Sequence, residues 1–308
     1  MMKKKVKFIG AASGWGAQIR TCEDGPLYLR DCSSLAFLNE RGIHVKEWEM
    51  VHPHTQFKEK NIPLSEALDV VADFNRRLSA SVSKAMQQQF FPLVIGGDHS
   101  NAIGTWNGVS LGWRQGKAAP FGLIWIDAHM DAHTLETTPS GAWHGMPLAS
   151  MMGYGALELS RLCREEPILR PEHLCLIGTR SFEEGEEELL RRLNVKIYYM
   201  DEVKERGMQE VLKEAIAHVN CGTQGYGVSL DVDVVDPSEA PGTGCFEPNG
   251  LAAGDLLQSL SLFREDPRLI AFELVEFNPH RDCEQMTALL CQNILAEVLQ
   301  PALCAITR

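Results

Sequence analysis

Residues 124–133 read Ile-Trp-Ile-Asp-Ala-His-Met-Asp-Ala-His, an apolar run that ends in a cluster of aspartates and histidines. The run is short and rich in β-branched and aromatic residues, which is typical of a buried strand. Two other segments have the same form: residues 93–100 read LVIGGDHS, and residues 228–237 read VSLDVDVVDP. In open α/β sheets, ligands bind beyond the carboxyl ends of the strands. The sequence therefore predicts that the three polar clusters meet at one site.

Strand-like runs alternate with segments of helical periodicity along the chain. The clearest helical pattern covers Leu64–Phe90, and the acidic run Glu183–Glu188 is predicted to be the solvated start of another helix. This alternation indicates parallel strands joined by right-handed crossovers, so we expect an α/β fold: three αβα layers with a central, mostly parallel eight-stranded sheet. The predicted strands are Val6–Ile9, Ile43–Glu49, Pro92–Ile95, Phe121–Ile126, His173–Ile177, Val195–Tyr199, Tyr226–Leu230 and Leu269–Val275, and the other predicted helices are Asp201–Val219, Gly254–Phe263 and Glu284–Leu299.

Length and composition describe an ordinary globular protein. The 308 residues would allow two domains, but no Pro/Gly/Ser-rich tract interrupts the alternation, so we expect one domain over residues 1–308. The formal net charge is −12, from 29 Lys and Arg against 41 Asp and Glu. Nucleic acids and anionic membranes attract basic surfaces, so neither is an expected partner.

The cysteine pattern and the N-terminus favour a cytoplasmic protein. Nine cysteines are scattered along the chain without a CxxC pair, which is typical of reduced thiols rather than a disulfide framework or a zinc ribbon. The apolar run after the first lysines is too short for a signal peptide, and no stretch approaches the length of a membrane span.

The spacing within the clusters points to bound cations. In an extended chain Asp127, His129 and Asp131 would face one space, and Asp231 and Asp233 would do the same from a neighbouring strand. Four aspartates that meet without a cation would repel one another. Two divalent cations about 3.5–4 Å apart would relieve the repulsion, and an oxygen-rich set without thiolates suits manganese. Each cluster alone would also suit a helix-capping turn, but three at the strand ends of one sheet favour a metal site.

The motifs GGDHS, DAHxD and SxDxDxxDP together resemble those of the ureohydrolase family, which includes arginase, agmatinase and related guanidino hydrolases. The match continues through Pro241–Gly244 and Glu273–Pro279, and it includes Gly25 and Pro26 near the N-terminus. It therefore covers nearly the whole chain. The resemblance implies a three-layer fold with an eight-stranded parallel sheet, two manganese ions per chain, and a homo-oligomer, either a trimer or a hexamer.

The resemblance also implies a set of metal ligands. One manganese would be held by His99, Asp127, Asp131 and Asp231, and the other by His129, Asp127, Asp231 and Asp233, with Asp127 and Asp231 bridging. All six positions carry the expected residue types, which disfavours a metal-stabilised, non-catalytic regulatory relative. A related fold that removes acetyl groups with one zinc would not need both Asp131 and Asp233 beside His99.

Two further residues would act on the substrate. A water shared by two cations loses a proton near neutral pH, and the resulting hydroxide would attack a rigidly held guanidinium carbon to release urea and an amine. Glu276 resembles the family glutamate that pairs with the guanidinium, although a surface acid is the alternative. His144, in SGAWHGMP at residues 140–147, resembles a histidine that shuttles protons to the departing amine. An ordinary hydrogen-bonded loop histidine is the alternative there.

The loop before His144 favours L-arginine, with L-ornithine and urea as products. Its TTPSG sequence at residues 137–141 resembles arginase more than agmatinase, whose corresponding loop lacks the Ser-Gly pair. In arginases this loop binds the α-carboxylate, a role that falls here to Ser140 and Thr138. The expected substrate-binding residues are His133, Thr138, Ser140, Glu183 and Thr243.

Several positions depart from the arginase pattern and leave the substrate open. His133 and Ala142 replace asparagines, and Ser181 and Glu183 stand where the family places aspartates. His133 also continues the alternating series from Asp127 and could touch the edge of the metal site. A histidine can still donate to a carboxylate and a glutamate can accept from an ammonium, so arginine stays the expected substrate. Agmatine, guanidinobutyrate and formiminoglutamate are the alternatives.

Overall fold

The computed structural model describes residues 5–32, 34–43, 45, 48–57, 62–113, 120–264 and 266–300. Its eight strands form one sheet in the order β2-β1-β3-β8-β7-β4-β5-β6, and every neighbouring pair is parallel. The predicted eight-stranded α/β fold is therefore confirmed, with a sheet that is parallel throughout. The strands are β1 (Val6–Ala11), β2 (Trp48–Val51), β3 (Phe91–Gly96), β4 (Gly122–Ile126), β5 (Leu174–Thr179), β6 (Lys196–Tyr199), β7 (Tyr226–Asp231) and β8 (Leu269–Val275).

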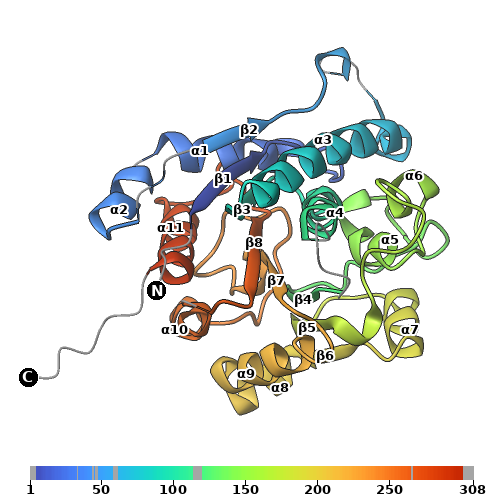
Figure 1. The fold of residues 1–308 in the computed structure, drawn as a ribbon. Helices are drawn as coiled ribbons and strands as arrows, with labels where there is room; N and C mark the ends of the chain where they lie inside the picture. Colours follow the sequence, from blue (N-terminus) through green and yellow to red (C-terminus); the bar gives the residue numbers. More distant parts are fainter. Residues whose placement is uncertain are drawn as a thin grey trace, which may run out of the picture.

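Helices cover both faces of the sheet (Figure 1). One apolar core joins the sheet to α8, α9, α10 and α11, and a second core joins its other face to α3, α4, α5 and α7. The helices are α1 (Gly25–Asp31), α2 (Ser34–Glu40), α3 (Leu68–Gln87), α4 (Ala102–Trp113), α5 (Pro147–Met151), α6 (Leu157–Ser160), α7 (Glu184–Arg192), α8 (Met200–Arg206), α9 (Met208–Val219), α10 (Ala253–Leu260) and α11 (Met286–Leu299). Among these described helices, none has the length and apolar character that crossing a membrane requires.

Several predicted boundaries are wrong for local reasons. The pattern at Asp201–Val219 forms two helices, because Gly207 between them adopts a φ of 85°, which residues with a side chain rarely adopt. The predicted helix Leu64–Phe90 begins with a separate 3₁₀ turn at Leu64–Glu66, and the one at Gly254–Phe263 ends in another, at Ser261–Phe263. The strand predicted at Ile43–Glu49 runs from Trp48 to Val51, and residues 44, 46 and 47 lie outside the described residues.

The acidic run Glu183–Glu188 does start a helix, but it is only partly solvated. Glu183 is the N-cap of α7 and forms a capping box with Glu186, an exchange of hydrogen bonds that satisfies free amides of the first turn. Glu186 is buried, so the prediction of a solvated helix start is wrong at this residue.

The four central strands β3, β8, β7 and β4 bring the polar clusters together. These strands are neighbours in the sheet, and each ends immediately before, or within, one of the motifs. Because parallel strands end at the same edge, the residues after β3, β4, β7 and β8 share one rim. The fold thus places the candidate site where the sequence predicts it.

Candidate metal centre and active site

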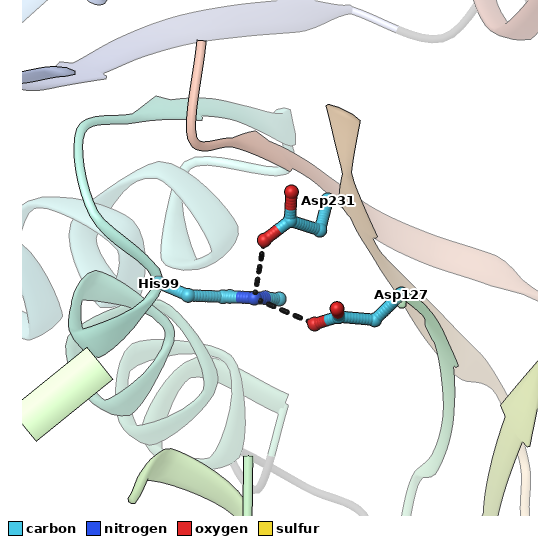
Figure 2. Close-up of side chains that lie close together, drawn as sticks. All are labelled: His99, Asp127 and Asp231. Carbon is cyan, nitrogen blue, oxygen red and sulfur yellow. Dashed lines mark ion pairs between the residues drawn. The ribbon is translucent and has the colours of Figure 1, made fainter. Parts of the chain in front are cut away.

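A histidine and three aspartates form the deepest part of the site. His99 Nδ1 lies 3.0 Å from Asp127 Oδ2, 3.0 Å from Asp131 Oδ2 and 3.2 Å from Asp231 Oδ2. Figure 2 shows Asp127 and Asp231 pointing toward the ring of His99. All four residues are buried. These predicted ligands, from the carboxyl ends of three different strands, therefore converge around one nitrogen atom.

A second group shares Asp127 with the first. His129 Nδ1 lies 3.1 Å from Asp233 Oδ2 and 3.4 Å from Asp127 Oδ1. Asp127 thus presents one carboxylate oxygen to each imidazole. The groups His99–Asp127–Asp231 and Asp127–His129–Asp233 each hold their potential ligand atoms within 4.8 Å of one another. All six predicted ligand residues are therefore brought together, in two adjoining groups.

Local backbone structure, rather than an extended chain, produces this convergence. β4 ends at Ile126, and Asp131 has a φ of 48°. Asp231 caps the 3₁₀ turn Val232–Val234, accepting from the Asp233 amide at 2.8 Å. The expected alternation of extended residues is therefore wrong for Asp131 and Asp233, and capping and ligand placement coexist at Asp231.

The electrostatics of the cluster fit a bound cation. Burial and the charge of Asp127 raise the pKa of Asp131 to about 6, and burial with the charges of Asp233 and Asp127 raises the pKa of Asp231. Buried like charges thus favour the protonated forms of Asp131 and Asp231 when no cation neutralises them. At Asp127, by contrast, hydrogen bonds to His129 and His99 outweigh burial and lower the pKa. His99 Nδ1 is buried and, among the described residues, has no partner at hydrogen-bonding geometry. A divalent cation would satisfy this nitrogen and the carboxylates together.

Glu276 lies beside this cluster, immediately after β8. It is buried, with a φ of 64°, so the alternative of a surface acid is wrong. Its Oε1 accepts from the His99 backbone amide at 2.8 Å, whereas Oε2 has no hydrogen-bond partner among the described residues. Gly244 lies next to this oxygen. Any other residue at this position would place its Cβ only 2.8 Å from Oε2, which is too close for a normal contact. The site thus keeps one carboxylate oxygen available and leaves space next to it.

His144 contacts Glu276 directly. Its Nδ1 lies 3.0 Å from Glu276 Oε1. Burial lowers the pKa of His144, but the hydrogen bond and the charge of Glu276 outweigh burial and raise it to about 9. The ring is therefore protonated at neutral pH, whereas an ordinary loop histidine is mostly neutral there.

Three residues of the site were missed by the sequence analysis. Gln18 Oε1 lies 3.2 Å from His144 Nε2. The buried Asp98 carboxylate accepts from the Gly16 amide at 2.8 Å and so ties the N-terminal loop to the site. Glu247 Oε1 lies 3.5 Å from His129 Nε2. Gln18 and Glu247 share no motif with the histidines that they approach. Asp98 directly precedes His99 in GGDHS, but this motif gives no sign of the bond to Gly16.

His133 belongs to a separate cluster. Its Nε2 lies 2.9 Å from Glu183 Oε2 and 3.2 Å from Glu186 Oε2, and its Nδ1 lies 3.0 Å from Thr137 Oγ1. Both ring nitrogens are thus engaged by this cluster rather than by the predicted metal ligands. The structure therefore brings together His133 and Glu183, two of the predicted substrate-binding residues.

The other predicted substrate-binding residues differ in accessibility. Ser140 is exposed, and its Oγ accepts from the Ala142 amide at 3.2 Å, while Thr138 Oγ1 accepts from the Gly141 amide at 3.0 Å. These bonds fix the loop and leave the hydroxyl protons for other acceptors. Thr243 is buried, and its hydroxyl donates to the Cys245 carbonyl. Thr243 thus shapes the turn that carries Gly244.

Comparison with known proteins agrees with this arrangement. Residues 4–300 match the family model of the Arginase family. The chain is 36% identical to the arginases of Brevibacillus brevis, over 96% of this chain and 98% of the relative, and of Bacillus caldovelox, over 92% and 94%. The crystal structure of arginase from Bacillus subtilis superposes with a TM-score of 0.87 at 31% identity, covering 98% of this chain and all of that chain. The chain therefore belongs to the arginase family and is a ureohydrolase, an enzyme that hydrolyses a C–N bond of a guanidino compound.

Proposed function

We propose that this enzyme hydrolyses L-arginine to L-ornithine and urea with two manganese ions. The observation that carries the proposal is the buried Oε2 of Glu276, which has no hydrogen-bond partner in the part of the chain that the structure describes, beside two His–Asp groups that share Asp127. A guanidinium needs a carboxylate for its charge and a nucleophile at its carbon, and this arrangement would provide both in one space. The names of the similar proteins support arginine in particular.

The six converging residues would hold the cations. His99 and Asp131 would serve one ion, His129 and Asp233 the other, and Asp127 and Asp231 both. Carboxylate and imidazole ligands without thiolates support manganese. When bound, two such ions would supply a water acidic enough to act as a nucleophile at neutral pH.

Glu276 and His144 would act on the substrate itself. Glu276 would pair with the guanidinium, and its Oε1 is already fixed by the His99 amide, so the guanidinium carbon would be held in one orientation. After attack at this carbon, the bond to the departing amine breaks as that nitrogen takes a proton. His144, with a pKa of about 9, holds a proton at neutral pH and would donate it.

Recognition of arginine would depend on its α-carboxylate and α-ammonium groups. The exposed Ser140 hydroxyl and that of Thr138 would donate to the carboxylate. Glu183 carries a half-exposed carboxylate that would accept from the ammonium, and His133 holds this carboxylate in place at 2.9 Å. Agmatine has no carboxylate, so it would lose the contacts to the loop.

A substrate panel tests the proposal. The manganese-loaded protein is given L-arginine, agmatine, guanidinobutyrate and formiminoglutamate, and urea or formamide release is measured. We expect the highest kcat/KM for L-arginine. Faster hydrolysis of agmatine would overturn the carboxylate-recognition argument, and no turnover of any of the four would overturn the proposed reaction.

Ser140→Ala is expected to raise the KM for L-arginine about tenfold, with kcat nearly unchanged. A hydrogen bond to a charged group contributes on the order of 1.5–3 kcal/mol, and the exposure of Ser140 places the loss at the lower end. Steady-state kinetics measure the change, with Ser261→Ala as control because Ser261 donates to Gln258 at the end of α10. An unchanged KM in the Ser140 variant would remove this residue from substrate recognition.

His144→Ala is expected to keep its metal and lose turnover about 100-fold or more, because general acid–base groups contribute roughly 10²–10⁴-fold. Elemental analysis and urea release are measured on the same sample. The control is His280→Ala, which removes an exposed histidine paired with Asp24 at 2.8 Å. Loss of metal from the His144 variant would show that this residue supports the metal centre instead.

A further inference from the structure

Glu273 is a buried carboxylate that the proposed reaction does not use. It lies within β8 and has no exposed surface. Its Oε2 accepts a hydrogen bond from Trp106 Nε1 at 3.1 Å and another from Ser229 Oγ at 2.7 Å. Burial raises the pKa of Glu273, and an isolated buried carboxylate is unfavourable for folding. An apolar side chain at position 273 would therefore be more favourable for folding, which suggests that the carboxylate has a function.

Ser229 connects Glu273 to the metal site. Ser229 on β7 is paired directly with Glu273 on β8 in the sheet, and both side chains lie on the same face. Ser229 Oγ also lies 2.9 Å from Nε2 of His99. The three side chains thus form a continuous hydrogen-bonded chain from the middle of the sheet to a predicted ligand.

The direction of each hydrogen bond in this chain can be assigned. The indole of Trp106 can only donate, and it shares the acceptor Glu273 Oε2 with the Ser229 hydroxyl, which donates to the same oxygen. The single proton of the Ser229 hydroxyl must then point to Oε2. Ser229 can therefore only accept from His99, and His99 Nε2 must carry a hydrogen.

This assignment determines which nitrogen of His99 is available to a metal. A neutral imidazole with a hydrogen on Nε2 has its lone pair on Nδ1, the atom that faces Asp127, Asp131 and Asp231. The ring is also stacked on Trp125, with centroids 4.0 Å apart and planes within 7°. Because Ser229 and Glu273 are fully buried, water does not compete for these hydrogen bonds.

We propose that Glu273 is a positioning residue that, through Ser229, holds His99 in the form whose Nδ1 binds metal. This inference rests on the metal centre of the proposed function. Outer hydrogen-bond partners of this kind commonly change metal affinity 10–100-fold. Among the described residues, this hydrogen-bonded chain reaches His99 and not His129, whose Nε2 lies 3.5 Å from Glu247 Oε1. Glu273 therefore supports one of the two proposed metal ions.

The test compares Glu273→Met, Glu273→Gln and Ser229→Ala in a manganese titration of the metal-free full-length protein. Glu273→Met removes the acceptor, so Ser229 can turn its proton toward His99; we expect about 10–100-fold weaker binding at one of two sites. Glu273→Gln keeps an acceptor oxygen without the charge, and a smaller loss is expected. Glu49→Gln is the matched control, because Glu49 also accepts from a serine, Ser81 Oγ at 2.7 Å, but lies on the edge strand β2.

Two further readouts separate positioning from a general structural role. The first readout is the manganese affinity of the double variant that combines Ser229→Ala with Glu273→Met. It is expected to equal that of whichever single variant binds less tightly, because both changes break the same hydrogen-bonded chain. Metal-free Glu273→Gln is expected to unfold at the wild-type temperature or higher, since it relieves a buried charge. Three results would overturn the inference. They are additive losses of manganese affinity in the double variant, equal weakening of both manganese sites, and wild-type manganese affinity in the Glu273 variants. Failure of the proposed function would appear separately, as absent urea release or absent manganese binding in the wild type.

Discussion

Asp127→Asn is expected to lose bound metal and activity together, with urea release from L-arginine falling at least 1,000-fold, or about 4 kcal/mol. Both carboxylate oxygens are engaged: Oδ2 lies 3.0 Å from His99 Nδ1 and Oδ1 lies 3.4 Å from His129 Nδ1. An asparagine keeps one oxygen and loses the negative charge, so both proposed ions lose a shared ligand. Elemental analysis and a urea assay on one preparation measure the two effects.

The control for this variant is Asp201→Asn. Asp201 is exposed in the first turn of α8, so the substitution removes the same charge away from the site. It is expected to retain metal and turnover. Full metal content in Asp127→Asn would contradict the assignment of Asp127 as a bridging ligand.

Glu276→Gln is expected to keep its metal and lose turnover at least 1,000-fold. The amide oxygen of the glutamine can still accept from the His99 backbone amide, so His99 is held as in the wild type. The charge that would pair with the guanidinium is lost, however, and a buried amide cannot replace a charge-assisted, two-pronged interaction. Metal content, KM and kcat are measured, and wild-type turnover of L-arginine would remove Glu276 from the reaction.

The same variant changes the protonation of His144. The hydrogen bond and charge of Glu276 raise the pKa of His144 to about 9. Because a raised histidine pKa depends on that negative charge, Glu276→Gln is expected to shift the His144 titration to lower pH. NMR of the imidazole signals measures the shift, and an unchanged pKa would show that other groups hold the proton.

The sheet and the convergence of the six His and Asp residues could be predicted because their signals are local. Apolar runs followed by His and Asp clusters mark strand ends, and the carboxyl ends of parallel strands meet at one rim. The detailed geometry could not be predicted in this way. The position of the Asp131 side chain depends on a left-handed backbone conformation, and that of Asp233 on a 3₁₀ turn. The alternation of side chains in an extended strand describes neither.

Partners that are distant in sequence escaped prediction for a different reason. Gln18 and His144 are 126 residues apart and Ser229 and His99 are 130 apart, so only the register and order of the strands bring them into contact. Periodicity predicts that Glu273 is in a strand but not that Ser229 lies opposite it. Likewise, the acidic composition at Glu183–Glu188 gives no sign that Glu186 is buried against His133.

A combined metal and activity titration tests the central claim most directly. Metal-free protein is titrated with manganese, and bound metal and urea release from L-arginine are measured on each sample. We expect no activity without metal, and activity that rises until two ions are bound per chain. Urea release by metal-free protein, or a single tightly held zinc with no second site, would contradict the proposed two-manganese hydrolysis of arginine.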